Sequence, residues 1–255
     1  MRSIRGGRGL GDAMYVQAVA RHLVHKGEKL RVYNDWPDLF LPLGDAVVTR
    51  PFSRAVDITA HYSMRKDCRD TNQFEDCCIQ AGLKEPADLM LDWTITDHPF
   101  IDSVIKQAKC KPICLVQMYR EPMNRKDGFG LELLPDPMRY QAMIDDIQAF
   151  KVLVGGGKPL HPVGNVDLDL TNKTSVCQLM DLAYICDAMF GFCSFMVPMA
   201  EQFDKRALFL WSRKGTKSQK RYIKQITPKK ILHKSTSQAV FDDDPEALRV
   251  AESFL

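Results

Sequence analysis

The sequence predicts an α/β protein of two small domains with parallel sheets. Short strand-like segments alternate with helix-like segments along the 255 residues, and this alternation is typical of parallel sheets. Hydrophobic residues make up 45% of the chain and charged residues 26%, as in ordinary globular proteins. The length allows one large domain or two of roughly 100–150 residues, and a strong apolar strand that begins after Pro112 favours two.

Residues 1–109 are expected to form the first domain. Residues 3–7 predict a strand that enters a glycine turn, and Asp12 opens a helical pattern that ends near Gly27. The remaining segments of this half continue the alternation. Strands are expected at 30–33, 46–48 and 89–93, and helices at 74–81 and 100–108.

Residues 110–243 are expected to form the second domain, because Lys111-Pro112 introduces the apolar run 113–116. A last helix is expected over 244–255, with Asp244 as its N-cap and Pro245 in its first turn. Between them, strands are expected at 151–154, 166–170, 188–192 and 207–211, and helices at 138–149, 175–185 and 197–203.

A glycine-rich loop, residues 6–11, lies between the first strand and the first helix. Glycines at such a place let backbone N–H groups approach a ligand closely. The loop has neither the Lys-Ser/Thr of a P-loop nor the spacing of a dinucleotide-binding loop. Asp12 at its mouth is a candidate general base or only the N-cap of the helix, and the local sequence alone favours the cap.

Three further candidate elements follow strands in the second half. Gly155 and Gly156 end a strand and leave room for a ring or ribose, although a plain turn is equally natural. Thr174 or Ser175 is most simply a helix N-cap. The helix that follows Ser194 and Phe195 could hold a phosphate at its N-terminus. Ligands of open α/β sheets bind beyond the carboxyl ends of strands, where all these elements lie.

Basic residues are concentrated in two segments. Arg120, Arg125 and Lys126 lie in a long polar loop and could neutralise a diphosphate or simply face solvent. Residues 212–240 contain no Asp or Glu and are dense in Lys and Arg. This stretch is either a solvated face or a surface for a polyanion. Its candidate DNA contacts are Lys217, Lys220, Arg221 and Lys224.

The sequence offers no recognisable metal site or hydrolase triad. The eight cysteines form no CxxC pair and no Cys/His cluster with zinc spacing, so we expect reduced thiols that pack as small hydrophobic groups. No metal or resident cofactor is expected. There is no apolar run of membrane-spanning length and no secretory h-region near the start, so a cytoplasmic location is expected, the host cytoplasm if the source is viral.

Taken in order, these elements resemble glycosyltransferase family 9, the heptosyltransferase-like enzymes. Residues 8–12 resemble the family's Gly-x-Gly-Asp opening before a helix. Residues 169–175, the following helix and 186–194 resemble its second-half motifs, and 207–211 resemble its next strand. The chain departs from the family in two places. Cys193-Ser194-Phe195 stands where the family has Asp-Ser-Gly, and Pro198 where it has His.

The resemblance implies a GT-B fold, in which two Rossmann-like domains with parallel sheets face a central cleft and the helix 244–255 returns to the N-terminal domain. It implies metal-independent, inverting transfer of a hexosyl, pentosyl or heptosyl group from a nucleotide-sugar, with Asp12 as the base. Arg8, Gly9 and Gly11 would form the acceptor-side loop. The donor site would comprise Arg120, Arg125, Lys126, Gly155, Gly156, Thr174, Ser175, Ser194 and Phe195.

Two questions stay open at this stage. The acceptor is either a saccharide, phosphorylated or part of a lipopolysaccharide, or a hydroxymethylated base in double-stranded phage DNA, which must be flipped out of the duplex. The alternative to an enzyme is a non-catalytic nucleotide- or nucleic-acid-binding protein on the same scaffold. The altered Cys193-Ser194-Phe195 segment favours that alternative, and the retained Gly11-Asp12 favours the enzyme.

Overall fold

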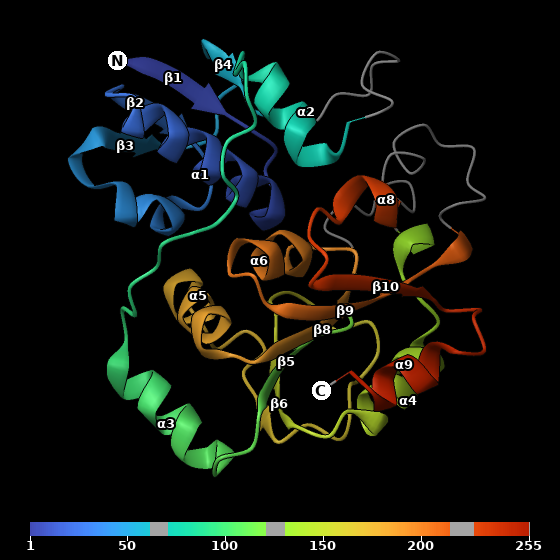
Figure 1. Cartoon of the computed structure of the whole chain (residues 1–255). Coiled ribbons are helices and arrows are strands. Elements are labelled where there is room, and N and C mark those ends of the chain that lie inside the picture. The colour runs from blue at the N-terminus through green and yellow to red at the C-terminus, as the bar shows by residue number, and fades with distance from the viewer. Residues whose placement is uncertain (62–70, 121–130, 215–226, 255) are drawn as a thin grey trace.

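The computed structural model contains two separate parallel sheets (Figure 1). It describes residues 1–61, 71–120, 131–214 and 227–254. Every ladder within the two sheets is parallel, so the predicted fold class is confirmed. The first sheet has the order β3-β2-β1-β4 and the second β10-β9-β8-β5-β6-β7. The strands are β1 (Arg2–Arg5), β2 (Leu30–Tyr33), β3 (Val47–Arg50), β4 (Ile58–Thr59), β5 (Ile113–Gln117), β6 (Phe150–Val154), β7 (Leu168–Asp169), β8 (Ala188–Phe192), β9 (Arg206–Trp211) and β10 (Ser237–Phe241).

Several helices begin where the sequence supplies a side-chain cap. Asn72 and Ser175 each form a reciprocal capping box with the residue three positions on, which satisfies two backbone donors at the helix start. Asp97 and Asp136 cap their helices through side-chain oxygens. The helices are α1 (Leu10–His25), α2 (Gln73–Gln80), α3 (His98–Ala108), α4 (Pro137–Asp146), α5 (Val176–Ile185), α6 (Met196–Gln202), α8 (Pro228–Ile231) and α9 (Ala247–Glu252), with 3-10 segments η1 (Pro37–Ala46) and η3 (Leu131–Leu133).

Helices α1 and α6 connect the two halves of the molecule. They lie between the two sheets in Figure 1 and pack against each other. One hydrophobic core cluster includes α1, α6 and residues of both sheets. A second cluster covers the other face of the larger sheet, against α4 and α9. The α1–α6 contact therefore places the N-terminus of α1 next to the second sheet.

The order in which the chain adds strands to the larger sheet reverses next to β5. The chain runs from β5 to β6 and β7 on one side, then returns to place β8, β9 and β10 on the other side. The carboxyl ends of β5 and β8 therefore flank a topological switch point, the usual place for a ligand crevice in a doubly wound sheet.

The strand predicted at 89–93 is not part of either sheet. Leu89, Leu91 and Trp93 are buried in alternation, which imitates a strand pattern, but the segment crosses as extended chain from one half to the other. The Leu91 N–H donates to the Gln202 carbonyl at 2.9 Å, and α3 then packs on α5. The chain thus joins the second half before α3, earlier than the expected boundary at 109/110.

The C-terminal helix does not return to the N-terminal half. Helix α9 packs against α4, and Ala247, Ala251 and Phe254 are buried in the core cluster on that face of the larger sheet. The expectation for 244–255 is therefore wrong, because the apolar side of this helix covers its own domain. Strand β10 was also missed, since it lies within the stretch interpreted as a basic surface.

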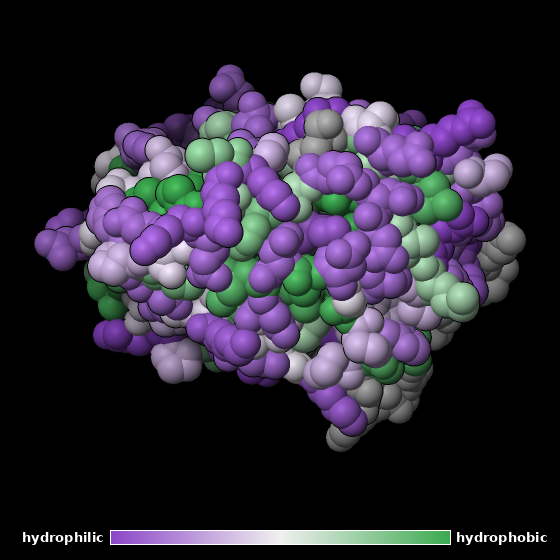
Figure 2. All heavy atoms as spheres, turned by 90° about the horizontal axis from the view of Figure 1, so that it is seen from below, coloured by the Kyte–Doolittle hydropathy of each residue, from purple (hydrophilic) through white to green (hydrophobic). Residues whose placement is uncertain are grey.

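The surface shows no large apolar area on the face seen in Figure 2, where hydrophobic side chains are exposed in small patches between hydrophilic ones. Over the described ranges, no helix has both the length and the apolar character needed to cross a membrane.

Candidate active site at the junction of the two sheets

Asp12 lies in the first turn of α1, three residues after the N-cap Gly9. The Gly9 carbonyl accepts the Ala13 N–H at 3.0 Å, so Asp12 is not the N-cap that the local sequence favoured. Its carboxylate instead accepts a hydrogen bond from the Gly9 backbone, as the third residue of a capping box does. Asp12 therefore supports the helix start and still directs its carboxylate toward the loop.

The glycines before Asp12 are required by packing. A Cβ on Gly7 would overlap the Asp12 carboxylate, and a Cβ on Gly6 would overlap Val16 and lie 2.7 Å from the Ala60 carbonyl oxygen. The loop backbone thus rests directly on the Asp12 side chain. This contact restricts where the carboxylate can lie.

The environment of Asp12 suits a general base. Burial raises the pKa of its carboxyl, while His61 and the Gly9 backbone hydrogen bond oppose that rise. The His61 Nε2 lies 3.7 Å from the Asp12 Oδ1, and the two side chains are 33% and 26% exposed. A carboxylate with a raised pKa that is still reachable is a better proton acceptor than an ordinary surface carboxylate.

Arg8 is held on the N-terminal side of the junction. Its Nε donates to Asp35 at 2.8 Å, and its backbone carbonyl accepts the Trp36 indole N–H at 2.9 Å. The guanidinium groups of Arg8 and Arg5 lie 5.4 and 5.8 Å from the centre of the Phe52 ring. Two cations over one aromatic ring therefore border the loop beside Asp12.

The predicted acceptor-side loop meets the second half at Gly11. A Cβ on Gly11 would lie 3.2 Å from the Phe195 Cα and 3.3 Å from the Pro198 Cγ. Phe195 is buried and belongs to the core cluster that includes residues of both sheets. The start of α1, with Asp12, and the turn before α6, with Ser194, are thus neighbours although they are about 180 residues apart.

The Ser194 hydroxyl is occupied within the protein. It donates to the Gln117 Oε1 at 2.7 Å and accepts the Met196 N–H at 3.2 Å. The same Gln117 oxygen accepts the Phe192 N–H at 3.3 Å. A hydroxyl has one proton to donate, so Ser194 has none left for a phosphate in this arrangement.

The glycine turn after β6 is held by Asn172 and Arg120. Gly155 and Gly157 have φ angles of +137° and +104°, which glycine adopts without strain. The Asn172 side chain accepts the Gly157 N–H at 2.7 Å and donates to the Gly157 carbonyl at 3.0 Å. Arg120 donates to the Gly156 carbonyl at 2.9 Å. Two predicted donor elements, Arg120 and the glycine turn, are therefore brought together.

Ser175 caps α5 through its hydroxyl, which accepts the Gln178 N–H at 3.1 Å, and Thr174 beside it is half-buried. The simpler interpretation of this pair as a helix start is thus confirmed for Ser175. Arg125, Lys126 and the candidate DNA contacts Lys217, Lys220, Arg221 and Lys224 lie outside the described residues.

Sequence reasoning missed several residues of the site. His61 approaches Asp12 from the end of β4, and Gln117 ends β5. Asn172 carried a weak signal, because Asn is tolerant of the left-handed conformation that it adopts here at φ +57°. Gln117 gave none, since a single polar residue at a strand end is common.

A buried carboxylate on α5, Asp181, holds the crossover segment. It accepts from the Trp93 indole at 2.7 Å, from the Thr96 N–H and hydroxyl at 3.0 and 2.8 Å, and from the Asp97 N–H at 2.9 Å. Burial raises the pKa of this carboxyl, but these hydrogen bonds outweigh burial and lower it. Asp181 is therefore an ionised anchor between the halves and takes no part in the site chemistry.

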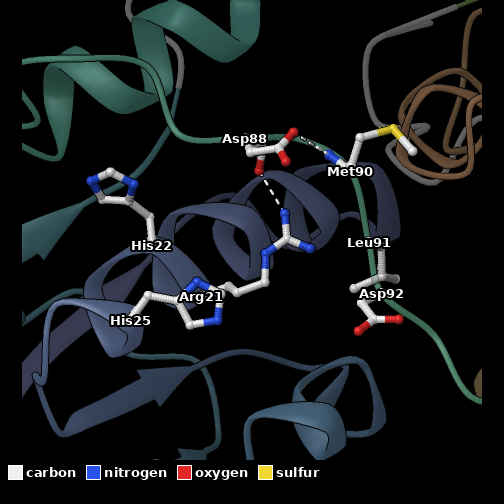
Figure 3. A pocket seen from close by; sticks show the side chains of 7 residues that line it. All are labelled: Arg21, His22, His25, Asp88, Met90, Leu91 and Asp92. Carbon is white, nitrogen blue, oxygen red and sulfur yellow. Dashed lines mark hydrogen bonds between the residues drawn. The ribbon is translucent and has the colours of Figure 1, made fainter.

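A hollow of about 380 Å³ lies at the other end of α1 (Figure 3). Arg21 reaches across it and donates to the Asp88 carbonyl at 2.6 Å. None of the residues predicted for the site lines it. Its lining residues are Arg21, His22, His25, Asp88, Met90, Leu91 and Asp92.

No group of three or more His, Cys, Asp or Glu residues that could hold a metal ion occurs in the part of the chain that the structure describes. The described cysteines are all free thiols, and Cys110 is exposed, whereas the sequence predicted burial.

Comparison with solved structures identifies the architecture. The chain is similar to E. coli ADP-heptose lps heptosyltransferase II, with a TM-score of 0.63 at 14% identity over 99% of this chain and 97% of that one. It shares the fold of this heptosyltransferase. A family 9 glycosyltransferase from Veillonella parvula gives a TM-score of 0.61 at 9% identity, over 99% of this chain and 88% of that one.

The iron-containing glycosyltransferase TibC from enterotoxigenic E. coli is also similar, with a TM-score of 0.57 at 11% identity, over 92% of this chain and 63% of that one. No protein-family model and no curated protein matches the sequence. At these identities the likeness establishes the GT-B-like fold, and the two parallel sheets agree with it.

Proposed function

We propose that the protein is a glycosyltransferase that moves a sugar from a nucleotide-sugar to an acceptor hydroxyl at the junction of its two sheets. The observation that carries the proposal is the placement of Asp12. A carboxylate with a burial-raised pKa lies beside His61 and next to the α1–α6 contact, on a fold shared with glycosyltransferases.

In this mechanism Asp12 accepts the proton of the acceptor hydroxyl as its oxygen attacks the anomeric carbon. Attack opposite to the leaving nucleoside diphosphate inverts the configuration at that carbon. His61 is placed to stabilise the ionised Asp12 before the transfer, since an adjacent imidazole lowers the pKa of the carboxyl. A positioned general base contributes roughly two to four orders of magnitude to rate.

The donor is proposed to lie over the carboxyl edge of the larger sheet. Arg120 brings a positive charge to the glycine turn, where Gly155 and Gly156 carry no side chain to obstruct a ring. Thr174 and the cap of α5 border the same edge. Charge neutralisation by Arg120, together with Arg125 and Lys126, would stabilise the departing diphosphate without a metal.

The acceptor is proposed to approach from the N-terminal half, where Arg5, Arg8 and Phe52 border the loop. A ring with two guanidinium groups suits a saccharide that carries negative charge. The DNA alternative depends on basic residues that lie outside the described ranges. Binding to duplex DNA at low salt, weakening with a log–log slope of roughly −3 to −5 as salt rises, would favour that alternative.

The test is release of nucleoside diphosphate from a panel of nucleotide-sugars, each incubated with the protein and with saccharide or modified-DNA acceptors. Acceptor-dependent release from one donor supports a transferase, and the stereochemistry of the product tests inversion. Tight donor binding without turnover on any acceptor would instead support the non-catalytic binding protein.

A further inference from the structure

Gln117 occupies a special position in the larger sheet. It is the last residue of β5 and is 1% exposed. Its strand is next to β8, across the point where the strand order reverses. Its side chain lies over Gly191, where an added Cβ would be 2.7 Å from the Gln117 Oε1. The sequence thus leaves space in β8 for this side chain at the switch point.

The orientation of the Gln117 amide is fixed by its neighbours. Its oxygen accepts both the Ser194 hydroxyl and the Phe192 N–H. The backbone N–H of Phe192 can only donate, so the amide cannot be turned around without placing two donors together. An amide oxygen has two lone pairs, and both are therefore used.

The other end of this amide has no partner among the described residues. The Gln117 Nε2 is buried and makes no hydrogen bond there, although it carries two N–H donors. Buried polar groups are nearly always hydrogen-bonded. What Gln117 can still bind is thus an acceptor only, and the oxygens of an ionised diphosphate are acceptors that never donate.

We propose that the Gln117 amide donates to an oxygen of the nucleoside diphosphate bound at this switch point, and that the Ser194 hydroxyl orients the amide. The inference rests on the proposed function, because it takes the donor's diphosphate as the ligand. Because the Nε2 atom is shielded from solvent, this contact requires the residues around it to move apart when the ligand binds. Gln117 thereby holds the phosphate that the sequence suggested for the helix N-terminus after Ser194.

The decisive variant is Gln117→Glu, which keeps the oxygen that Ser194 and Phe192 contact and replaces only the donating NH₂. Wild-type and variant protein are titrated with ADP, GDP, UDP and CDP by calorimetry at pH 8 and pH 6. We expect the variant to bind the preferred nucleotide about tenfold or more weakly at pH 8. The gap should narrow at pH 6, because burial raises the pKa of the new carboxyl and protonation restores an O–H donor.

Two controls separate this role from a structural one. Gln17 is also a buried glutamine whose amide has no partner in the described part of the chain, and Gln17→Glu should change nucleotide affinity by less than about threefold. Ser194→Ala should weaken binding by no more than about fivefold, since its proton is already donated to Gln117. This second variant keeps the test informative if Gln117→Glu does not fold.

Three results would overturn the inference. A folded Gln117→Glu protein that binds the nucleotide as wild type does at pH 8 would leave the amide serving only the fold. A tenfold or larger loss in Ser194→Ala, with Gln117→Glu little affected or unfolded, would return the donor contact to Ser194. Failure of the wild-type protein to bind any of the four nucleotides would overturn the proposed function and this inference with it.

Discussion

The carboxyl edges of the two sheets use their polar residues in opposite ways. At the edge of the smaller sheet, the glycine loop makes room for one carboxylate, Asp12, which stays a quarter exposed. At the edge of the larger sheet, the Ser194 hydroxyl donates to Gln117, and the Ser175 hydroxyl accepts the Gln178 N–H at the start of α5. The comparison teaches that a polar residue at a strand end is a candidate for chemistry only after its internal hydrogen bonds are counted.

Apart from replacing Asp12 itself, the largest effect is expected from closing the space above its carboxylate. Gly7→Ala places a Cβ where the Asp12 carboxylate now lies, so the carboxylate must move and the transfer rate should fall by about 100-fold or more. The rate of product formation measures this. Gly164→Ala is the matched control, because a Cβ there would meet no atom closer than 3.9 Å. Equal rates in the two variants would break the link between the loop and the base.

The second prediction tests the anchor of the crossover segment. Asp181→Asn replaces one of the two accepting oxygens with an NH₂ that faces two of the four donors, so the free energy of unfolding should fall by about 2–4 kcal/mol. Denaturant unfolding measures the change, with the exposed Asp102→Asn as a control expected within about 0.5 kcal/mol. Because its folded pKa is lowered, Asp181 stabilises the protein above the ordinary carboxyl pKa, and this is lost as pH falls through the folded pKa.

The third prediction concerns an acid buried inside the junction. Glu201 on α6 accepts the His233 and Lys234 N–H groups at 2.8 and 3.2 Å, and burial raises its pKa to about 7. A raised folded pKa gives stability that is full at low pH and is lost as pH rises toward 7. Glu201→Gln keeps the accepting oxygen, so its stability relative to wild type should rise by roughly 1–3 kcal/mol between pH 4.5 and pH 8.

His233 gives the free energy of unfolding the opposite dependence on pH. Its ring Nε2 lies 4.0 Å from the Glu201 Oε2, and burial lowers its pKa to about 4. The unfolded chain therefore binds a proton below about pH 6.5 that the folded chain does not. In wild type the effects of Glu201 and His233 on stability oppose each other as pH falls. The Glu201→Gln variant keeps only the effect of His233, so it should lose stability on acidification from pH 6.5 to pH 4. A variant as flat as wild type over this range would contradict the assignment.

The smallest effect is expected at the cap of α5. Ser175→Ala removes the oxygen that accepts the Gln178 N–H and should lower stability by about 1 kcal/mol, while Ser175→Asn should restore it. Thermal unfolding measures both variants. If the alanine and asparagine variants are equally stable, the Ser175 hydroxyl does not contribute to the cap. The carboxyl edge of the larger sheet would then resemble that of the smaller sheet, where Asp12 is available for chemistry.

Much of the fold follows from local patterns in the sequence. The alternation of apolar strands with capped helices predicted both parallel sheets, and Gly6 and Gly7 marked the loop because packing leaves no room for a side chain there. The strand predicted over 89–93 was wrong, because alternating burial of Leu89, Leu91 and Trp93 arises from a crossover between halves.

The parts of the site that the sequence did not predict depend on long-range contacts. His61 meets Asp12 only when β4 pairs with β1. Gln117 meets Ser194 only when β5 and β8 pair at the switch point. Neither pairing has a signature in the sequence near these residues.

The central claim is that Asp12 is the base, and Asp12→Asn tests it most directly. Asparagine keeps an oxygen for the Gly9 backbone but cannot accept the acceptor's proton, so the helix start should persist while chemistry is lost. The rate of transfer should fall by roughly two to four orders of magnitude, with nucleotide affinity and melting temperature near those of wild type. A wild-type rate in Asp12→Asn would contradict the account and leave Asp12 as a support of the helix alone.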